Sequence, residues 1–481
     1  MEAAGRSVTA IRTVGYTGWV HMNHRHRPEV LAPAGNLRGL KTAVDYGADA
    51  VYCGGKAFGM RSAPKNLSLE DFEEGSRYAH EHGARVYVTC NVLPRNAEIE
   101  ELKEYLGQLK DTGVDALIVT DIGVMMAARR IAPNLELHVS TQAGVTNYLA
   151  ANALYELGAK RVVLAREMDL QAVRDIRANI PEDMDIECFV HGAMCMAFSG
   201  RCLFSNYLTG RDGNHGECAQ PCRWKYAIVE EKRPGRYFPI EQTKDGAYLF
   251  NSQDMNMLEH LDDLIDAGAT SLKIEGRSKS AYYIAAMTNA YKSAVNEYMI
   301  QRGFEDQDGA VLTPFHDRVR RTTPGETPRL GESAIDTSTP APAPVVLPDW
   351  LREEPYKVAH RDYSTGFYYP DHPVTQNTDR SHYFRDWLVV GEVLGWSPDE
   401  GGRLTIMSRN KIEAGQLVEF VLPGRAPYSY TVPSGGFRDE NGVWVPAINN
   451  PAHVFSMPCP EPMPVNAAIR SRTKQTTMKA E

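Results

Sequence analysis

Residues 45–51, DYGADAV, carry the pattern that decides the fold, because four other segments repeat it. The repeats are EHGARVY at 81–87, DTGVDAL at 111–117, ELGAKRV at 156–162 and DAGATSL at 266–272. In each segment a glycine follows a helical pattern and precedes a short β-branched or aliphatic run. Glycine tolerates the left-handed conformation that ends a helix, so each segment predicts a helix, a glycine cap and then a strand. Five copies of one junction predict a repeated βα unit.

The repeat places eight strands along the first 300 residues. They are expected near residues 29–32, 49–53, 85–90, 115–120, 136–140, 161–165, 185–190 and 271–275. Runs such as ALIV at 116–119 are continuously apolar, as in strands buried on both faces. We therefore predict an α/β fold, a (β/α)8 TIM-like barrel. A doubly wound open sheet is the alternative, although no G-x-G-x-x-G follows the first strand to support it.

The composition indicates which segments precede and follow the barrel. In residues 350–465, short segments in which hydrophobic and polar residues alternate are separated by Gly and Pro. This pattern predicts a small C-terminal β-barrel domain. The expected parts are a disordered extension at 1–27, the barrel at 28–304 with a cysteine-containing loop at 191–250, a Pro-rich linker or insertion at 305–349, the β-domain at 350–465 and a frayed tail at 466–481.

The net charge, the lengths of the apolar runs and the cysteine content limit the classes of protein to which the chain can belong. The 481 residues carry a net charge of −9, which argues against a generally basic nucleic-acid binder but not against a local basic patch. No apolar run approaches the ~20 residues that span a bilayer, so we expect no membrane contact. The chain is long and not rich in cysteine, which favours a reducing cytoplasm over an extracellular disulfide framework.

Four of the eight cysteines lie within 28 residues, just past the seventh strand. Their spacing is C-x6-C-x15-C-x3-C, and four thiolates this close can meet at one soft metal centre. A 4Fe–4S cluster held by all four fits this spacing best. Structural zinc stays an alternative, because only the second pair resembles a zinc knuckle. The expected metal ligands are Cys195, Cys202, Cys218 and Cys222.

Polar residues follow the predicted strands, at the end of a barrel where catalytic groups are found. They are Asn91, Gln142, Arg166, Glu167, His191, Gln253, Asp254, Lys273, Glu275 and Arg277. Each of them is equally consistent with a structural ion pair or cap. The guanidinium and ammonium groups suit a carboxylated small molecule. No H-E-x-x-H, G-x-S-x-G or P-loop signature is present.

The segment ECFVHGAMCMAFSGRCLFSN at 187–206 resembles the signature of the family named peptidase U32, or collagenase-like. Further matching segments are PEVLAPAGN at 28–36, DAVYCGGKAFGMR at 49–61, HVSTQAGVTN at 138–147, LKIEGR at 272–277, VAHRDYSTGF at 358–367 and GEVLG at 391–395. Despite its name, the family implies hydroxylation of RNA or of quinone precursors, and a 4Fe–4S cluster on four cysteines.

In length and C-terminal layout the chain is similar to members that hydroxylate tRNA. That resemblance implies 5-hydroxyuridine formation at the wobble position with prephenate as co-substrate, and iron–sulfur assembly proteins as possible partners. Prephenate is a dicarboxylate, and the residues expected to bind it are Arg61, Asn91, Gln142, Arg166, Lys273 and Arg277. Proton transfer is expected from His191, Glu275 and Asp254.

Basic and aromatic residues surround the cysteines and are candidates to bind RNA. They are Arg201, Arg211, Arg223, Lys225 and Trp224, beside Tyr207 and Tyr226. The competing interpretation is that the aromatic side chains pack the long loop. Three other functions stay open: a peptidase, an rRNA cytidine hydroxylase and a zinc-stabilised RNA-binding protein.

Overall fold

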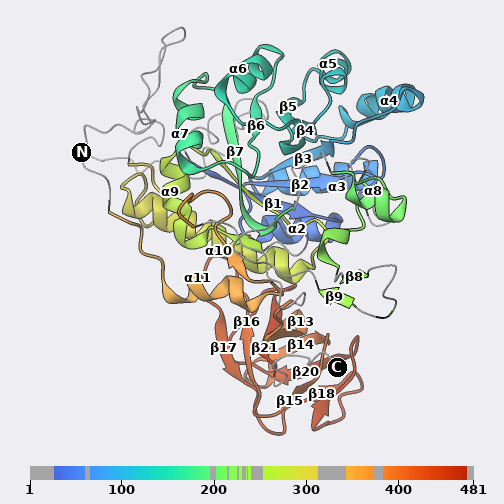
Figure 1. Cartoon of the computed structure of the whole chain (residues 1–481). Coiled ribbons are helices and arrows are strands. Elements are labelled where there is room, and N and C mark those ends of the chain that lie inside the picture. The colour runs from blue at the N-terminus through green and yellow to red at the C-terminus, as the bar shows by residue number, and fades with distance from the viewer. Residues whose placement is uncertain are drawn as a thin grey trace.

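A computed structural model gives the structure of the chain, which has two parts, a barrel surrounded by helices and a smaller β-domain at one side of it (Figure 1). The described residues are 27–59, 66–195, 202–213, 216–224, 227–229, 235, 237–239, 253–312, 343–372 and 383–473. All of the predicted N-terminal extension except Arg27, and most of the predicted linker, therefore lie outside them.

Eight parallel strands form the barrel, as the repeat predicts. They are β1 (Glu29–Ala34), β2 (Ala50–Gly54), β3 (Arg85–Cys90), β4 (Ala116–Val119), β5 (Glu136–Val139), β6 (Arg161–Val163), β7 (Asp185–Ala193) and β11 (Ser271–Ile274). Consecutive strands pair in parallel from β1 to β7, and β11 pairs in parallel with both β7 and β1. The sheet is thus closed, which confirms the barrel and excludes the open sheet.

Helices cover the outside of the barrel (Figure 1). They are α2 (Leu37–Asp45), α3 (Leu69–Glu81), α4 (Ile99–Leu109), α5 (Ile122–Ile131), α6 (Tyr148–Glu156), α7 (Leu170–Ala178), α9 (Leu261–Asp266) and α10 (Ala281–Gln301). The glycine of every repeated junction has a φ between +77° and +104°. These are the left-handed turns that the sequence predicts between helix and strand.

A chain of buried charges crosses the interior of the barrel. Arg161 on β6 lies with its Nη1 atom 2.6 Å from Glu29 Oε1 on β1 and 3.3 Å from Glu187 Oε2 on β7. The other oxygen of Glu187 accepts a hydrogen bond from Lys273 Nζ on β11 at 2.5 Å. All four side chains are buried, so each charge depends on its neighbours for compensation.

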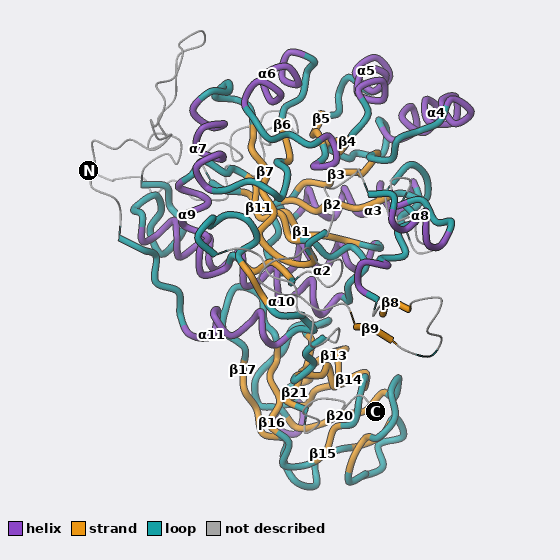
Figure 2. Tube along the Cα trace, viewed as in Figure 1, coloured by secondary structure: helices purple, strands orange, loops and turns teal. Residues whose placement is uncertain are grey.

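The end of β7 extends past the barrel and carries a further pairing that the sequence analysis did not predict. Residues 191–193 pair antiparallel with β10 (Asp254–Asn256), which pairs in turn with β12 (Tyr363–Ser364). Figure 2 shows the strands of the barrel in orange at the centre of the molecule. Strands of two or three residues are too short to show an alternating pattern, which explains why they were missed.

The C-terminal part is an antiparallel β-domain with its own hydrophobic core. Its main sheet has the order β17-β16-β21-β13-β14-β20-β18, and β15 pairs with β19. The strands are β13 (Trp387–Ser397), β14 (Arg403–Ser408), β15 (Ile412–Glu413), β16 (Leu417–Phe420), β17 (Tyr428–Thr431), β18 (Arg438–Asp439), β19 (Ala447–Ile448), β20 (Val454–Pro458) and β21 (Ala468–Arg472). Shorter elements elsewhere are α8 (Phe204–Thr209), β8 (Ala227–Val229), β9 (Tyr237–Pro239) and α11 (Asp349–Glu353).

Strand β21 corrects the predicted tail at 466–481. The structure places β21 inside the sheet, between β16 and β13, and Arg470 on it is fully buried. Arg470 forms ion pairs with Glu354 and with Glu419, whose Oε2 lies 2.6 Å from Arg470 Nη2. An arginine in a sequence normally indicates the surface, so the pattern alone placed this strand outside the fold.

Direct contacts join the two parts. Tyr46, which follows α2, donates its hydroxyl to the carbonyl of Val421 at 2.8 Å, and the backbone N–H of Gly424 donates to Asn289 Oδ1 at 2.7 Å. The β-domain therefore packs on the α2 and α10 side of the barrel. Within the described residues, no helix is both long and apolar enough to span a bilayer.

We expect Arg161→Met to destabilise the barrel by about 3 to 5 kcal/mol, because Glu29 would lose its compensating charge while buried. Urea unfolding followed by circular dichroism measures this change. Lys160→Met is the matched control, since the exposed Lys160 pairs with Asp183 at 3.0 Å at the surface and should change stability by less than about 1 kcal/mol. Equal effects of the two substitutions would show that the buried charges do not hold the barrel together.

Candidate active site at the carboxyl ends of the barrel strands

The structure gathers most of the predicted polar residues at one end of the barrel. Asn91 follows β3, Gln142 lies in a short 3-10 turn after β5, and Arg166 follows β6. Glu275 and Arg277 follow β11. Because the carboxyl ends of parallel strands meet at one face of a closed barrel, these side chains lie at the same end of it, which we call the barrel mouth.

Arg166 contacts residues of two neighbouring strands at the mouth. Its Nη1 atom donates to the carbonyl of Ala193 at 3.0 Å, and its Nη2 atom lies 3.2 Å from Glu275 Oε2. The guanidinium carbon lies 3.9 Å from the ring centre of Phe189 on β7. The side chain is only 6 % exposed. Arg166 therefore ties together the ends of three neighbouring strands, β6, β7 and β11.

Arg277 occupies the opposite side of β11, next to β2 and β3. Its Nη1 atom donates to Thr89 Oγ1 at 2.8 Å. A Cβ atom on Gly54 would lie 2.4 Å from that same nitrogen, so the absence of a side chain at Gly54 leaves the room that the guanidinium fills. The Arg277 side chain is partly exposed and can present charge to a carboxylate at the mouth.

Polar groups on β3, β4 and β5 complete the rim of the mouth. Thr120 donates its hydroxyl to Gln142 Oε1 at 3.2 Å and lies 3.1 Å from the carbonyl of Asn91. Thr120, which contacts Asn91 and Gln142, and Thr89, which accepts a hydrogen bond from Arg277, are not among the residues predicted from the sequence. Their position directly at the ends of β3 and β4 was the available signal.

Lys273 lies deeper than the other candidates, inside the barrel. Besides Glu187, it faces the ring of Tyr52, whose centre lies 4.5 Å from Nζ. The ammonium group is buried and already compensated by a carboxylate. Lys273 is therefore suited to a structural role beneath the mouth. Arg277 is better placed than Lys273 to bind a dicarboxylate.

The structure buries His191 among tyrosines. The imidazole is 1 % exposed, and its Nδ1 atom lies 3.2 Å from the hydroxyl of Tyr291 on α10. The ring also packs against Tyr283 and Tyr363. Burial lowers the pKa of His191 to about 3, so the ring is neutral near pH 7. These surroundings favour a structural role over the predicted proton transfer.

Asp254, the third predicted proton-transfer residue, forms a buried ion pair with Arg361. Its Oδ1 atom accepts from Arg361 Nη2 at 2.6 Å and from Nε at 3.0 Å. Burial opposes ionisation, but the adjacent Arg361 outweighs it and lowers the pKa of Asp254. The pair joins β10 to the segment before β12, so Asp254 attaches the C-terminal part of the chain to the mouth.

The four clustered cysteines differ from the other four in their surroundings. All eight are free of disulfides. Cys53, Cys90 and Cys188 lie in the barrel strands, where burial raises the pKa of each thiol to about 12. In contrast, Cys195 and Cys218 are exposed, and Cys202 and Cys222 are partly exposed.

The chemistry of this donor set suits a soft metal centre, because four accessible thiols lie in the loop after β7. Within the described ranges, however, no three His, Cys, Asp or Glu side chains form a group that could hold a metal ion. The link between the first two cysteines, residues 196–201, lies outside those ranges. A proposal for a cluster at Cys195, Cys202, Cys218 and Cys222 therefore rests on donor identity and location.

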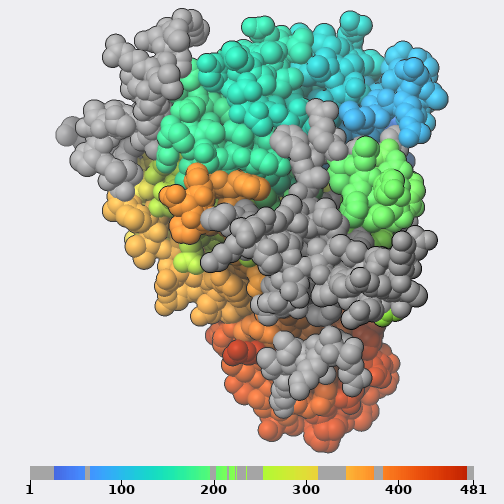
Figure 3. Space-filling model, viewed as in Figure 1, coloured from blue at the N-terminus to red at the C-terminus, as the bar shows by residue number. Residues whose placement is uncertain are grey.

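The RNA-binding candidates that the structure describes lie on the surface of the cysteine loop. Tyr207 on α8 is 87 % exposed and Trp224 is 47 % exposed, and Arg211 is also exposed. Helix α8 forms a protruding green surface in Figure 3. Arg201, Lys225 and the side chain of Arg223 lie outside the described residues, so the structure does not place these candidates. Arg61, a candidate for the dicarboxylate site, also lies outside them.

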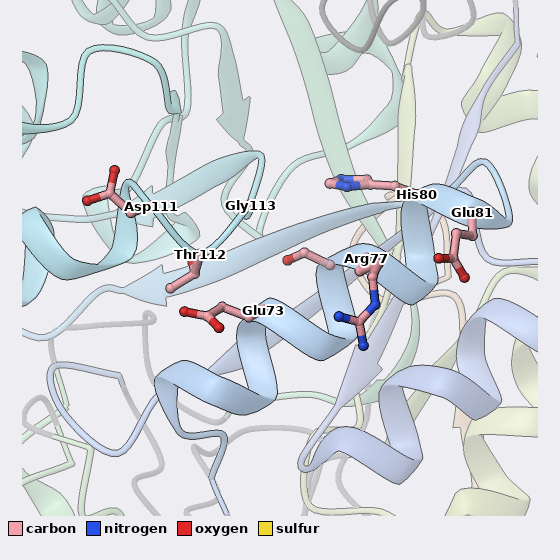
Figure 4. Close-up of a pocket in the computed structure, with 8 residues that line it drawn as sticks. Glu73, Arg77, His80, Glu81, Asp111, Thr112 and Gly113 are labelled. Carbon is pink, nitrogen blue, oxygen red and sulfur yellow. The ribbon is translucent and has the colours of Figure 1, made fainter. Parts of the chain in front are cut away.

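A pocket of about 580 Å³ lies away from the mouth, between the end of α3 and the turn before β4 (Figure 4). Its lining includes His80, Arg77 and Asp111. His80 Nε2 lies 2.9 Å from Asp115 Oδ2, which also accepts from the backbone N–H of Val86 at 2.7 Å. Because strands begin at this end of the barrel, the pocket belongs to the face that normally serves stability.

Comparison with known proteins agrees with this architecture. Residues 35–325 match the model of peptidase family U32, and residues 385–470 match that of the peptidase family U32 C-terminal domain. A relative named tRNA hydroxylation protein P1 from Bacillus subtilis (strain 168) is 34% identical over 89% of this chain and 91% of its own length.

Two other relatives have different names. An uncharacterized protease from Methanocaldococcus jannaschii is 37% identical over 73% of this chain and 75% of that protein. A 23S rRNA 5-hydroxycytidine synthase from Escherichia coli (strain K12) is 38% identical over 56% of this chain and 41% of its own length. Similar chains thus carry the names of tRNA hydroxylation, rRNA hydroxylation and proteolysis.

The low pKa of His191 predicts a specific pH dependence of stability. The unfolded histidine binds a proton near pH 6.5 and the folded one only near pH 3, so stability is complete above about pH 6.5 and falls as the pH drops toward 3. His191→Phe removes this group while keeping a ring. Between pH 7 and pH 5 the wild type should lose about 2 kcal/mol more than the variant in urea unfolding. An equal loss would mean that His191 titrates normally and is available for proton transfer.

Proposed function

The chain belongs to peptidase family U32, and on that premise we propose that it is an RNA hydroxylase that acts on tRNA. The observation that carries the proposal is the 34% identity to a tRNA hydroxylation protein along nearly the whole of both chains. The site is consistent with it, because the mouth offers guanidinium and amide groups for a small anionic co-substrate, and exposed aromatic side chains lie on the neighbouring loop.

More specifically, we propose that the chain forms 5-hydroxyuridine at the wobble position of tRNA, with prephenate as co-substrate. Uracil C5 is a poor site for direct attack by water, so oxygen transfer there needs an oxidant or an activated carrier. Prephenate is a dicarboxylate, and Arg277 is the candidate to bind one of its carboxylates because it is partly exposed and held by Thr89. Gln142 and Asn91 supply the polar rim on the other side of the mouth.

The cofactor in this proposal is a 4Fe–4S cluster held by Cys195, Cys202, Cys218 and Cys222. A cluster with four protein thiolates supplies electron transfer, or it braces the long loop. The loop begins directly at the end of β7, so a cluster there would lie beside Arg166 and Glu275. Insertion of the cluster would make iron–sulfur assembly proteins partners of the chain.

RNA recognition is assigned to the surface of the same loop. Tyr207 and Trp224 expose aromatic faces on which unpaired bases can stack, and Arg211 supplies charge for a phosphate. A base must leave its stack before its C5 atom can reach the mouth. The exposure of these two rings favours base stacking over the alternative that they only pack the loop.

Proteolysis is a second candidate because of the family name and the relative described as a protease. The side chains at the mouth give little support to proteolysis. His191 is buried with a pKa of about 3, which leaves it a weak general base at pH 7. Glu275 is already occupied by Arg166.

Nucleoside mass spectrometry of total tRNA tests the proposed function. A deletion strain should lose 5-hydroxyuridine and its derivatives, and the wild-type gene should restore them. Arg277→Gln should restore at most about a tenth of the modified nucleoside, because it loses a charge-assisted contact worth ~1.5–3 kcal/mol. The exposed Arg130 on α5 gives the control Arg130→Gln, which should restore it fully.

Three outcomes separate the candidates in that experiment. Unchanged tRNA together with loss of 5-hydroxycytidine from 23S rRNA would replace the tRNA assignment by the rRNA one. Unchanged tRNA and rRNA would contradict RNA hydroxylation. Cleavage of casein by the purified wild type, abolished in Cys202→Ser, would support the peptidase.

Metal analysis of anaerobically purified protein tests the cofactor. We expect about four iron and four sulfide per chain and a brown colour that bleaches on reduction. Cys218→Ser should lose most of the iron, whereas Cys459→Ser should keep it, because Cys459 is buried in the β-domain. Stoichiometric zinc without iron or sulfide would contradict the cluster and favour the zinc-stabilised RNA-binding protein.

A further inference from the structure

Two exposed guanidinium groups meet one carboxylate at the junction between the barrel and the β-domain. Arg38 on α2 pairs with Glu392 Oε1 on β13, and the Nη2 atom of Arg409, which directly follows β14, lies 2.9 Å from Glu392 Oε2. The side chains of Arg38 and Arg409 are 52 % and 42 % exposed, whereas that of Glu392 is only 11 % exposed. The junction therefore buries the acid and presents both cations to the solvent.

The charges of this group do not balance. Burial opposes ionisation of Glu392, but hydrogen bonds from the two guanidinium groups outweigh it and lower the pKa of the carboxyl group. Two positive charges against one negative charge leave a net positive charge near pH 7. The neighbouring lysines differ, because Lys41 pairs with Glu74 and Lys411 pairs with Glu413, each at 2.6 Å. The excess positive charge therefore resides on the two arginines.

This group lies beside the barrel mouth. β1 ends at Ala34 and α2 begins at Leu37, so Arg38 is in the first turn of the helix that leaves the carboxyl end of β1. Gly35 touches the segment after β11, because a Cβ atom at Gly35 would clash with the carbonyl oxygen of Arg277. Arg38 follows Gly35 by three residues, so their Cα atoms are at most about 11 Å apart. A long ligand that reaches Arg277 can therefore extend to the junction.

We propose that Arg38 and Arg409 bind the phosphate backbone of the RNA whose base enters the mouth. This inference rests on the proposed function. The whole chain carries a net charge of −9, so an RNA needs local positive charge to bind it. Guanidinium groups suit this role, because their planar N–H groups can donate two hydrogen bonds to the oxygens of one phosphate. Glu392 holds both groups at the junction, where the RNA would contact the barrel and the β-domain together.

A purely structural role for these ion pairs makes different predictions. If they only fastened the β-domain to α2, loss of either arginine would lower stability without changing the salt dependence of RNA binding. Neutralisation of Glu392 would then weaken RNA binding or leave it unchanged. If the guanidinium groups bind phosphates, neutralisation of Glu392 should instead strengthen RNA binding, because its carboxylate competes with the RNA for the same two cations.

Fluorescence anisotropy distinguishes these roles. The probe is a labelled anticodon stem–loop RNA with uridine at the wobble position, titrated with anaerobically purified full-length protein at several salt concentrations. Arg38→Gln and Arg409→Gln should each weaken binding about tenfold at low salt, the effect of one lost charge-assisted hydrogen bond. Each should also reduce the slope of log affinity against log salt concentration by about 0.7 to 1.

Three further variants complete the experiment. Arg38→Lys keeps the charge and should keep the wild-type slope. Glu392→Gln should bind the RNA more tightly than the wild type. Arg130→Gln is the matched control, because Arg130 is exposed in the last turn of α5, at the opposite end of the barrel. It removes the same charge and should leave the affinity and the slope unchanged.

Each outcome decides the inference. Weaker binding with a smaller slope in the two Arg→Gln variants, and tighter binding in Glu392→Gln, support it. Wild-type affinity and slope in both Arg→Gln variants overturn it, and the tRNA of the deletion strain then still decides the proposed function. An equal loss in Arg130→Gln also overturns it, because any surface charge would then serve. If Arg38→Gln does not fold, an unchanged slope in Arg409→Gln overturns it. A wild type that does not bind the RNA overturns this inference and contradicts the proposed tRNA substrate.

Discussion

Closure of the barrel by β11 is the constraint on which the rest of the structure depends. β11 is separated from β7 by about 80 residues of chain, yet it pairs with both β7 and β1. The buried charges lie at this seam, since Glu29, Arg161, Glu187 and Lys273 come from β1, β6, β7 and β11. Arg161 and Lys273 pair with Glu187 across neighbouring strands, and Arg161 pairs with Glu29 across the interior, so all four charges are compensated only when the barrel is closed.

The same seam assembles the candidate site. Arg166 follows β6, Cys195 follows β7 and Glu275 follows β11, so their contacts exist only when these three strands are adjacent. The β-domain is attached beside them, through β10, β12 and the ion pair between Asp254 and Arg361. Barrel closure, the cysteine loop and the attachment of the second domain are thus structurally linked.

Much of the barrel was predictable because local and global signals agree in it. The glycine at each of the five repeated junctions needs a positive φ, and the strand that follows it is buried, so these junctions can be recognised in the sequence. The location of Asn91, Gln142, Arg166 and Arg277 at the mouth followed from the strand ends alone. Their partners did not, because Arg166 and Glu275 are 109 positions apart and Arg277 and Thr89 are 188 apart, and pairing over such separations leaves no local pattern.

What the sequence does not reveal has a common physical cause. Arg470 lies in the predicted tail and Asp254 is a predicted proton-transfer residue, and the structure buries each against a partner distant in sequence, Glu354 and Arg361. His191 follows a strand as a catalytic histidine would, and only the three-dimensional structure shows the tyrosines that enclose it. Charge and strand position are visible in a sequence, whereas burial and compensation of charge are not.

The central claim is that the cysteine loop holds an iron–sulfur cluster at the barrel mouth. Anomalous X-ray diffraction at the iron edge, from crystals of anaerobically purified protein, tests it most directly. The account predicts one strong iron peak bounded by Cys195, Cys202, Cys218 and Cys222, with Arg166 beside it. A map without iron, or iron bound anywhere other than at these four sulfur atoms, would contradict it.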